Sequence, residues 1–178
     1  MDCPARIRAL LAELNISTEL IRTRGLPLCE EPAQLELADV GDDGREYRLT
    51  PDAAAAWRRM KSAAAAEGVA LKLISAFRSI DRQVEILREK LAEGQSVAEI
   101  LSASAPPGYS EHHTGCALDI GTPGCPPLEE AFEGTPAFAW LQANSGRHGF
   151  RLSYPRDNRF GYLYEPWHWR WRPRQATP

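Results

Sequence analysis

The chain has 178 residues, of which 43% are hydrophobic and 25% are charged, and its formal net charge is −3 at pH 7. These proportions are those of a soluble globular protein, and the length suffices for one domain with a sizeable core. The small negative charge gives no indication of binding to nucleic acid or to anionic membranes. No apolar run approaches the ~20 residues that a helix needs to span a bilayer, so we expect no membrane segment.

The N-terminus does not have the form of a secretory leader. Charged residues such as Asp2 and Arg6 interrupt its apolar positions, which leaves no continuous hydrophobic region. Taken as written, the sequence therefore predicts a cytoplasmic protein. In that compartment we expect free thiols, although Cys116 and Cys125 could pair under oxidising conditions.

The first part of the chain alternates helical and extended patterns. Apolar residues at helical spacing predict an amphipathic helix over residues 4–14, and the Pro- and Gly-rich residues 23–31 predict a loop. Residues 35–37 and 46–49 alternate about a Gly-Asp-Asp-Gly turn, which is typical of a hairpin. The alanine-rich residues 50–67, which begin with Thr-Pro, predict a long helix with a threonine cap.

An apolar strand over residues 69–75 leads into a second long helix over residues 80–93, which Ser79 can cap. Arg78 lies at this junction between strand and helix. Backbone N–H groups and a guanidinium can converge on an anion at such a position. An isolated arginine would by itself be interpreted as part of a surface ion pair.

The second half of the chain contains shorter predicted elements. It shows no internal repeat and no domain linker, so one domain is expected. The elements are a helix over residues 97–101, a loop over 105–109, a strand over 116–120, a helix from Thr135-Pro136 to about residue 144, and strand-like pieces over 162–165 and 167–171.

Three of the four histidines fall in two short segments. Residues 110–119 read SEHHTGCALD and follow a Pro-Pro-Gly turn, and residues 165–168 read EPWH. Together these segments supply the two imidazoles and one carboxylate that a catalytic zinc ion takes, with a position left open for water. Either His112 or His113 could be the first ligand, and Glu165 is left over as a base.

The alternation in residues 167–171 (WHWRW) places three tryptophans on one face of a strand and His168 with Arg170 on the other. A histidine held between packed tryptophans is rigid, as a metal ligand must be. The same alternation would send Glu165 to the tryptophan face. Its role as a base therefore requires a turn at Pro166 that redirects it.

The motif S-x-H-x-x-G-x-A-x-D at residues 110–119, followed by E-P-W-H-W at residues 165–169, resembles the VanY/VanX-like peptidases. These are zinc D-alanyl-D-alanine carboxypeptidases and dipeptidases, a group that also includes L,D-carboxypeptidases of peptidoglycan stem peptides. Residues 75–83 look like the family's S-x-x-R-S-x-x-x-Q segment. We therefore expect a single domain over residues 1–178, with an N-terminal extension over 1–45 and a zinc carboxypeptidase core over 46–172.

The resemblance implies a small α+β domain with a central antiparallel sheet flanked by helices and one zinc ion at the sheet. It selects His112 over His113, which is then expected to pack or to form hydrogen bonds. The implied site residues are the zinc ligands His112, Asp119 and His168, the base Glu165, and Arg78, Gln83 and Ser110 near the substrate.

The function implied by the resemblance is release of terminal D-alanine from a peptidoglycan stem peptide or muropeptide. The D,D- and L,D-bonds stay equally open, and a cytoplasmic location favours precursors or recycled muropeptides. Arg78 could bind the terminal carboxylate or stabilise the oxyanion. An endopeptidase of related fold would not need a carboxylate-binding arginine, and a non-catalytic zinc-containing binding domain would not need Glu165.

Overall fold

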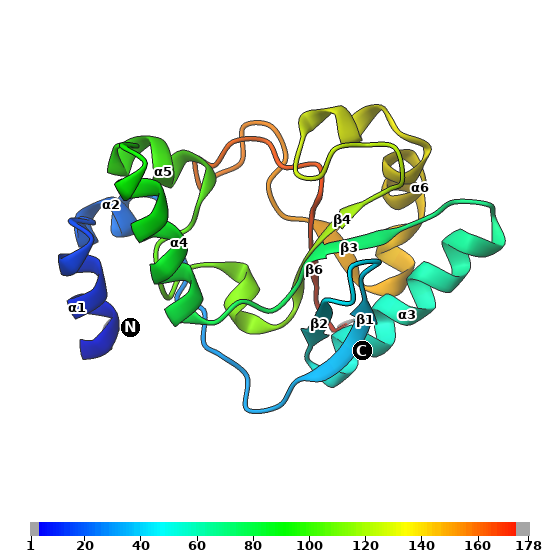
Figure 1. Ribbon diagram of the computed structural model, residues 1–178, viewed down its shortest axis with the longest axis horizontal. Coiled ribbons are helices and arrows are strands. Elements are labelled where there is room, and N and C mark those ends of the chain that lie inside the picture. Colours follow the sequence, from blue (N-terminus) through cyan, green and yellow to red (C-terminus); the bar gives the residue numbers. More distant parts are fainter. Residues whose placement is uncertain (1–3, 174–178) are drawn as a thin grey trace, which may run out of the picture.

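A four-stranded antiparallel sheet lies at the centre of the computed structural model, which describes residues 4–173. The strand order is β3-β4-β6-β5, and a separate hairpin pairs β1 with β2 (Figure 1). The strands are β1 (Glu36–Val40), β2 (Glu46–Leu49), β3 (Lys72–Ser75), β4 (Ala117–Gly121), β5 (Phe150–Leu152) and β6 (His168–Trp171). The predicted α+β class with a central antiparallel sheet is confirmed.

One face of this sheet is covered by helices α3 (Pro51–Ala66) and α6 (Pro136–Asn144), which build the larger hydrophobic core with it. Leu118, Ile120 and Trp169 enter this core from β4 and β6. Side chains alternate along a strand, so Asp119 and His168 project from the opposite face. The predicted tryptophan face is confirmed, because Trp169 belongs to the core while Trp167 and Trp171 pack against it.

A second hydrophobic cluster joins four helices on the left of Figure 1, namely α1 (Ala5–Glu13), α2 (Thr18–Thr23), α4 (Ile80–Ala92) and α5 (Val97–Ala103). Leu11 of α1, Leu87 of α4 and Leu101 of α5 are almost completely buried in it. Residues before position 45 thus share a core with helices after it. The division into an extension and a carboxypeptidase core stays a prediction.

Most predicted helix starts are formed as expected. Ser79 accepts a hydrogen bond from the N–H of Arg82 at 3.1 Å, and Thr135 accepts one from Phe138 at 3.2 Å. Thr50 precedes α3, but its side chain makes no capping hydrogen bond. Its hydroxyl lies instead 3.5 Å from the Cys116 thiol.

Three details differ from the predicted elements. The strand predicted over residues 162–165 is wrong, because this segment crosses the helical cluster, where the N–H of Leu163 bonds to the carbonyl of Ser102 at 2.9 Å. Strand β3 is shorter than predicted because Val69 still bonds back to Ala64 of α3. Helix α2 was not predicted; Ser17 caps it by accepting from the Glu19 N–H.

The described part of the chain also contains the 3₁₀ helices η1 (Glu111–Thr114), η2 (Glu130–Gly134) and η3 (Ser145–His148). Within residues 4–173, none of the helices combines the length and apolar character needed to cross a bilayer. Cys29, Cys116 and Cys125 are free thiols.

Candidate metal centre

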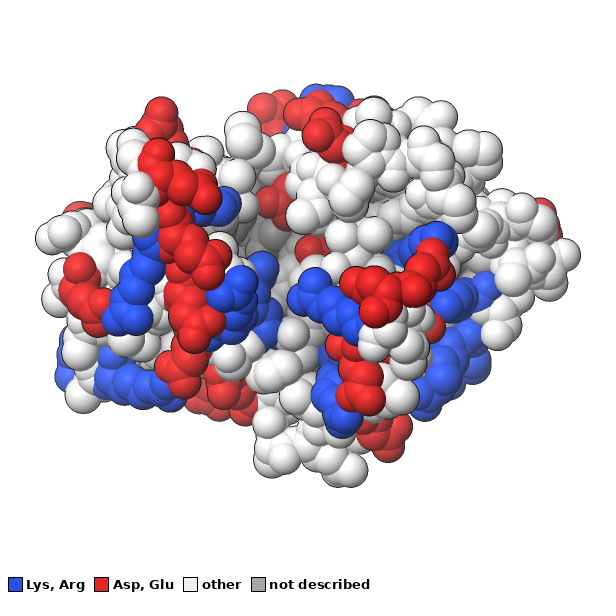
Figure 2. Space-filling model, viewed as in Figure 1, with Lys and Arg blue, Asp and Glu red and all other residues white. Residues whose placement is uncertain are grey.

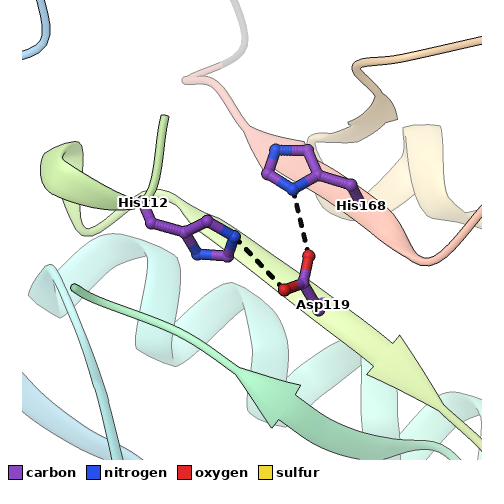
Figure 3. Close-up of side chains that lie close together, drawn as sticks. All are labelled: His112, Asp119 and His168. Atoms are coloured by element: carbon purple, nitrogen blue, oxygen red, sulfur yellow. Dashed lines mark hydrogen bonds and ion pairs between the residues drawn. The ribbon is translucent and has the colours of Figure 1, made fainter. Parts of the chain in front are cut away.

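Two histidines and one aspartate converge on the open face of the sheet. His112 comes from η1, Asp119 from β4 and His168 from the start of β6. Asp119 and His168 are direct partners in the β4–β6 ladder, so the strand register itself brings them together. Figure 3 shows both imidazole rings directed at the Asp119 carboxylate. His112 Nε2 lies 3.3 Å from Asp119 Oδ2, and His168 Nδ1 lies 3.0 Å from Oδ1.

The ring of His112 is fixed by its second nitrogen. Nδ1 donates to the carbonyl of Ala76 at 2.7 Å, which leaves the lone pair of Nε2 directed at Asp119. Gly115 ends η1 in a left-handed conformation, with φ of 62°. A Cβ at this position would lie 2.9 Å from Leu35 Cδ2, so glycine lets the chain turn from η1 into β4 beneath the hairpin.

The ring of His168 is fixed by Glu111, which the sequence analysis did not select. His168 Nε2 lies 3.2 Å from Glu111 Oε2, so Nδ1 is the nitrogen that faces Asp119. The same carboxylate bonds to the Ser153 hydroxyl at 2.5 Å and to Arg170 at 2.8 Å. The available signal was Arg170, a charged residue on the His168 face that needed an acidic partner.

The charges of these buried groups depend on one another. Burial opposes ionisation, but contacts with His112 and His168 hold the pKa of Asp119 well below its usual range. Against the same effect of burial, His168 and Arg170 lower the pKa of Glu111 to about 2. Burial disfavours the imidazolium of His168, yet Asp119 and Glu111 raise its pKa to about 10. In the metal-free protein a proton therefore occupies the nitrogen that faces Asp119.

His113 cannot serve as a ligand in this arrangement, because both of its ring nitrogens are occupied. Nδ1 donates to the carbonyl of Arg78 at 2.7 Å, and Nε2 accepts from the N–H of Gly108 at 3.2 Å. Burial lowers the pKa of His113 to about 4, so the ring is neutral. The packing role predicted for His113 agrees with these contacts.

The convergent residues open onto a cavity of about 530 Å³ between the helical cluster and the sheet. The molecular surface is visibly hollowed between these two parts (Figure 2). The lining of the cavity includes His112, Asp119 and His168 together with Arg78, Ser110 and Glu165. Six of the seven predicted site residues thus share one cavity.

Glu165 reaches the cavity through the turn that its predicted role required. Pro166 and Trp167 form a turn in which the N–H of His168 bonds to the carbonyl of Glu165 at 3.1 Å. The Glu165 carboxylate lies 3.8 Å from His168 Nδ1. Burial is the main reason that its pKa is raised to about 7, although His168 and Arg78 act in the opposite direction. A carboxyl group with such a pKa can both accept and donate a proton near neutrality.

Arg78 stands between β3 and α4, as predicted, and its guanidinium lines the cavity. One terminal nitrogen donates to the Ser110 hydroxyl at 3.4 Å. Its Nε is buried and has no hydrogen-bond partner within the part of the chain that the structure describes. Burial lowers the pKa of Arg78, which the charges of Asp119 and Glu165 partly offset. A buried guanidinium with an unused N–H is suited to an anionic ligand.

Comparison with known proteins agrees with this geometry. Residues 46–174 match the model of the VanY family, described as D-alanyl-D-alanine carboxypeptidase. The chain belongs to this family. Among curated relatives, YodJ of Bacillus subtilis, named as a carboxypeptidase, is 35% identical over 171 residues, which cover 92% of this chain and 62% of YodJ. The chain therefore spans less than two thirds of that relative's length.

Two solved structures are similar to this VanY-family chain. The LdcB LD-carboxypeptidase superposes with a TM-score of 0.70 and 36% identity, covering 79% of this chain and 69% of LdcB. A variant of the vancomycin-resistance D,D-pentapeptidase VanY, solved with Zn(II), gives a TM-score of 0.62 and 32% identity. That match covers 83% of this chain and 88% of VanY.

Gln83 is the one predicted site residue of this VanY-family chain that does not line the cavity. It is only 1% exposed on α4, and its Nε2 donates to the carbonyl of Ala105 at 2.7 Å. Ala105 does line the cavity. Gln83 therefore supports the cavity wall from behind.

Tyr154 is a further cavity residue that the sequence analysis missed. Its ring stacks on that of His168, with centroids 4.6 Å apart and an angle of 29° between the planes. Burial raises its pKa far above the usual range, so the phenol stays neutral. In the VanY-family site the stacked Tyr154 ring restricts the orientation of His168 by contact with the face of its imidazole.

Proposed function

We propose that this protein is a zinc-dependent carboxypeptidase that releases terminal D-alanine from peptidoglycan stem peptides. The observation that carries the proposal is one cavity holding three metal donors, a carboxyl group with a raised pKa and a guanidinium with an unused N–H. The similar proteins act on D,D- or L,D-bonds by their names, so the proposal covers both. Action on cytoplasmic precursors or recycled muropeptides stays a prediction.

The donor set fits zinc. His112 would bind through Nε2, His168 through Nδ1 and Asp119 through a carboxylate oxygen; donor atoms of the three residues lie within 4.8 Å of one another. Two imidazoles and one carboxylate leave a coordination position open, as in catalytic rather than structural zinc sites. The second nitrogen of each ring is already held, by Ala76 and by Glu111, which is the usual support of ligating histidines.

The proposed reaction uses the metal, Glu165 for proton transfer and Arg78 for binding of the substrate. A zinc ion held by His112, Asp119 and His168 would supply a Lewis acid that polarises the scissile carbonyl and makes the attacking water more acidic. Glu165 accepts a proton from the attacking water on its carboxylate and passes it to the amine of the leaving D-alanine. A C–O bond forms, the C–N bond breaks, and the products are the shortened peptide and free D-alanine.

Arg78 makes the proposed enzyme an exopeptidase. Its position at the start of α4 lets the guanidinium meet the terminal carboxylate of the peptide, with Ser110 orienting one of its nitrogens. Amidation of the substrate's C-terminus removes the charge that Arg78 binds. We therefore expect wild-type protein to release D-alanine from free penta- or tetrapeptide stems and nearly none from C-terminally amidated stems, as measured by mass spectrometry.

Arg78→Lys serves as the companion variant. An ammonium cannot reproduce the bidentate fork of a guanidinium, so kcat/KM should fall by at least ~10-fold for free stems. Arg82→Lys is the matched control, since Arg82 forms ion pairs with exposed Glu85 and Glu89 and does not line the cavity. Equal cleavage of free and amidated stems by the wild type would favour the endopeptidase. Retained zinc with no cleavage of any stem would favour a binding domain.

Glu111→Gln is expected to weaken zinc binding by about 10- to 100-fold, the usual effect of losing a carboxylate behind a ligating histidine. The amide can turn its NH₂ group toward His168 Nε2, which moves the ring proton to Nδ1, the atom that would bind metal. Competition with a chromogenic chelator measures the affinity. Ser153→Ala removes a hydrogen bond to the same carboxylate without touching His168, and should leave the affinity nearly unchanged. Wild-type affinity in Glu111→Gln would show that Glu111 does not set the tautomer.

A further inference from the structure

Lys90 is a second cation in the proposed substrate cavity, and the proposed mechanism does not use it. It lies in the last turn of α4 and lines the same cavity as Arg78. Its Nζ donates to the hydroxyl of Ser104 at 2.8 Å. Ser104 follows α5 and also lines the cavity, so this contact joins the two helices at the cavity wall.

Lys90 differs from the other two lysines of the chain in its partners. Lys61 pairs with Asp39 at 2.6 Å, and Lys72 pairs with Asp42. Between residues 4 and 173, no carboxylate lies within ion-pair distance of Lys90, whose hydrogen-bond partner Ser104 is neutral. An ammonium group that faces a cavity with only a neutral partner can gain a charge-assisted hydrogen bond from an anionic ligand.

The spacing of Arg78 and Lys90 defines the ligand that could reach both. Ile80 and Lys90 are ten positions apart in α4, which corresponds to about 15 Å along the helix axis. An extended peptide advances about 3.3–3.6 Å per residue. With the reach of two long side chains, a peptide whose terminal carboxylate meets Arg78 would bring a group about three or four residues upstream to Lys90.

Pentapeptide stems of peptidoglycan carry an acidic group in that region, about three residues upstream of the terminal one. Their D-glutamate is linked through its γ-carboxyl, which leaves its α-carboxyl as a free anion on the acyl side of the scissile bond. Arg78 and Lys90 are the arginine and lysine side chains that line this cavity within residues 4–173. With Arg78 bound to the terminal carboxylate, Lys90 is the cation left for an upstream carboxylate.

We propose that Lys90 binds this second carboxylate and makes the enzyme selective for stems with a free D-glutamyl α-carboxyl over the α-amidated form. The inference rests on the proposed function, because it takes the stem peptide as substrate. Arg78 binds the terminal carboxylate of the peptide, and Lys90 binds the D-glutamyl α-carboxylate on the acyl side of the scissile bond.

The test compares wild type and Lys90→Met on two pentapeptide stems that are identical except for a free or amidated D-glutamyl α-carboxyl. Methionine keeps an unbranched side chain and good helix propensity while it removes the charge. Wild type should cleave the free acid with about 10-fold higher kcat/KM, the size expected for one charge-assisted hydrogen bond. Lys90→Met should cleave both stems at the lower rate, with the loss mainly in KM.

Two control variants separate recognition from folding. Ser104→Ala removes the neutral partner but keeps the ammonium, so the preference for the free acid should survive. Lys72→Met removes an exposed lysine that pairs with Asp42 away from the cavity, and should change neither stem. An equal loss on both stems in Lys90→Met would mean that Lys90 only supports the fold, and equal wild-type rates on both stems would also overturn the proposal.

Binding of the same two stems to Glu165→Gln protein, measured by calorimetry, separates this inference from the proposed function. A preference for the free acid that disappears when Lys90→Met is added would sustain the role of Lys90 even if the wild type cleaved neither stem. Equal affinities for both stems in Glu165→Gln would overturn the role of Lys90 even if the wild type proved to be a carboxypeptidase.

Discussion

Asp119→Ala is expected to abolish stoichiometric zinc binding and, with it, all D-alanine release above background. Asp119 is the residue on which both imidazoles converge, at 3.3 Å and 3.0 Å, and it is only 5% exposed. Without its carboxylate, His112 and His168 remain as two imidazole ligands, too few for a catalytic zinc site. Metal analysis after dialysis against a zinc buffer measures the stoichiometry.

The same substitution also removes a buried counter-charge, so folding must be checked separately. Asp119 helps to hold His168 protonated in the metal-free protein, and burying a charge whose partner is lost is costly. Circular dichroism establishes whether the variant is folded, and His112→Ala provides a second ligand variant that leaves the Asp119–His168 contact in place. Asp81→Ala, at an exposed ion pair with Arg6, is the matched control. A full equivalent of zinc in both ligand variants would mean that the ligand set is wrong.

Much of the fold could be predicted because its signals are local. The threonine and serine caps at Thr135 and Ser79 need only the residues that follow them, and both are formed. The hairpin of β1 and β2 follows from alternation about a turn rich in Gly and Asp. The alternation of Trp and His in β6 predicted which face is buried, because a strand has only two faces.

The strand predicted over residues 162–165 was wrong because the structure of this segment depends on contacts with residues far away in the sequence. Residues 162–165 were predicted to be strand-like, but strand pairing needs a partner, and here the backbone of Leu163 bonds to Ser102 near the end of α5. Tyr162 is buried in the helical cluster under the guanidinium of Arg24, which lies 4.2 Å from the ring centroid. A contact between residues 138 positions apart leaves no trace in a local pattern.

The site shows the same division. His112, Asp119 and His168 were predicted because they stand in motifs, and the strand register then brought Asp119 beside His168. Glu111 and Tyr154 were missed because their roles depend on the tertiary structure. Glu111 forms a hydrogen bond with His168 Nε2, and Tyr154 stacks on the His168 ring. Sequence reasoning therefore identified donor atoms, while the groups that orient them required the structure.

Glu165→Gln is expected to lower kcat by about 10²- to 10⁴-fold while the protein still binds one equivalent of zinc. The substitution preserves the size of the side chain and its place in the turn at Pro166, but an amide cannot accept the proton of the attacking water. Since Glu165 is not among the three converging donors, metal affinity should not fall. Steady-state release of D-alanine, measured on the zinc-loaded variant, gives kcat and KM separately.

The split between these constants identifies the role. A base acts in the transition state, so kcat should fall while KM for the free stem stays close to the wild-type value. A Glu165 that only shaped the cavity would change KM instead, and one that bound zinc would change the metal content. Glu133→Gln, at an exposed ion pair with Arg156, controls for a change of carboxylate to amide elsewhere.

Wild-type kcat in a fully metallated Glu165→Gln protein would assign the proton transfer to another group. Tyr154 also lines the cavity, but burial keeps its phenol neutral, so it cannot replace a carboxylate base near pH 7. The turn at Pro166 directs the Glu165 carboxylate toward the face on which the metal donors converge, whereas a continuous strand would have directed it to the tryptophan face.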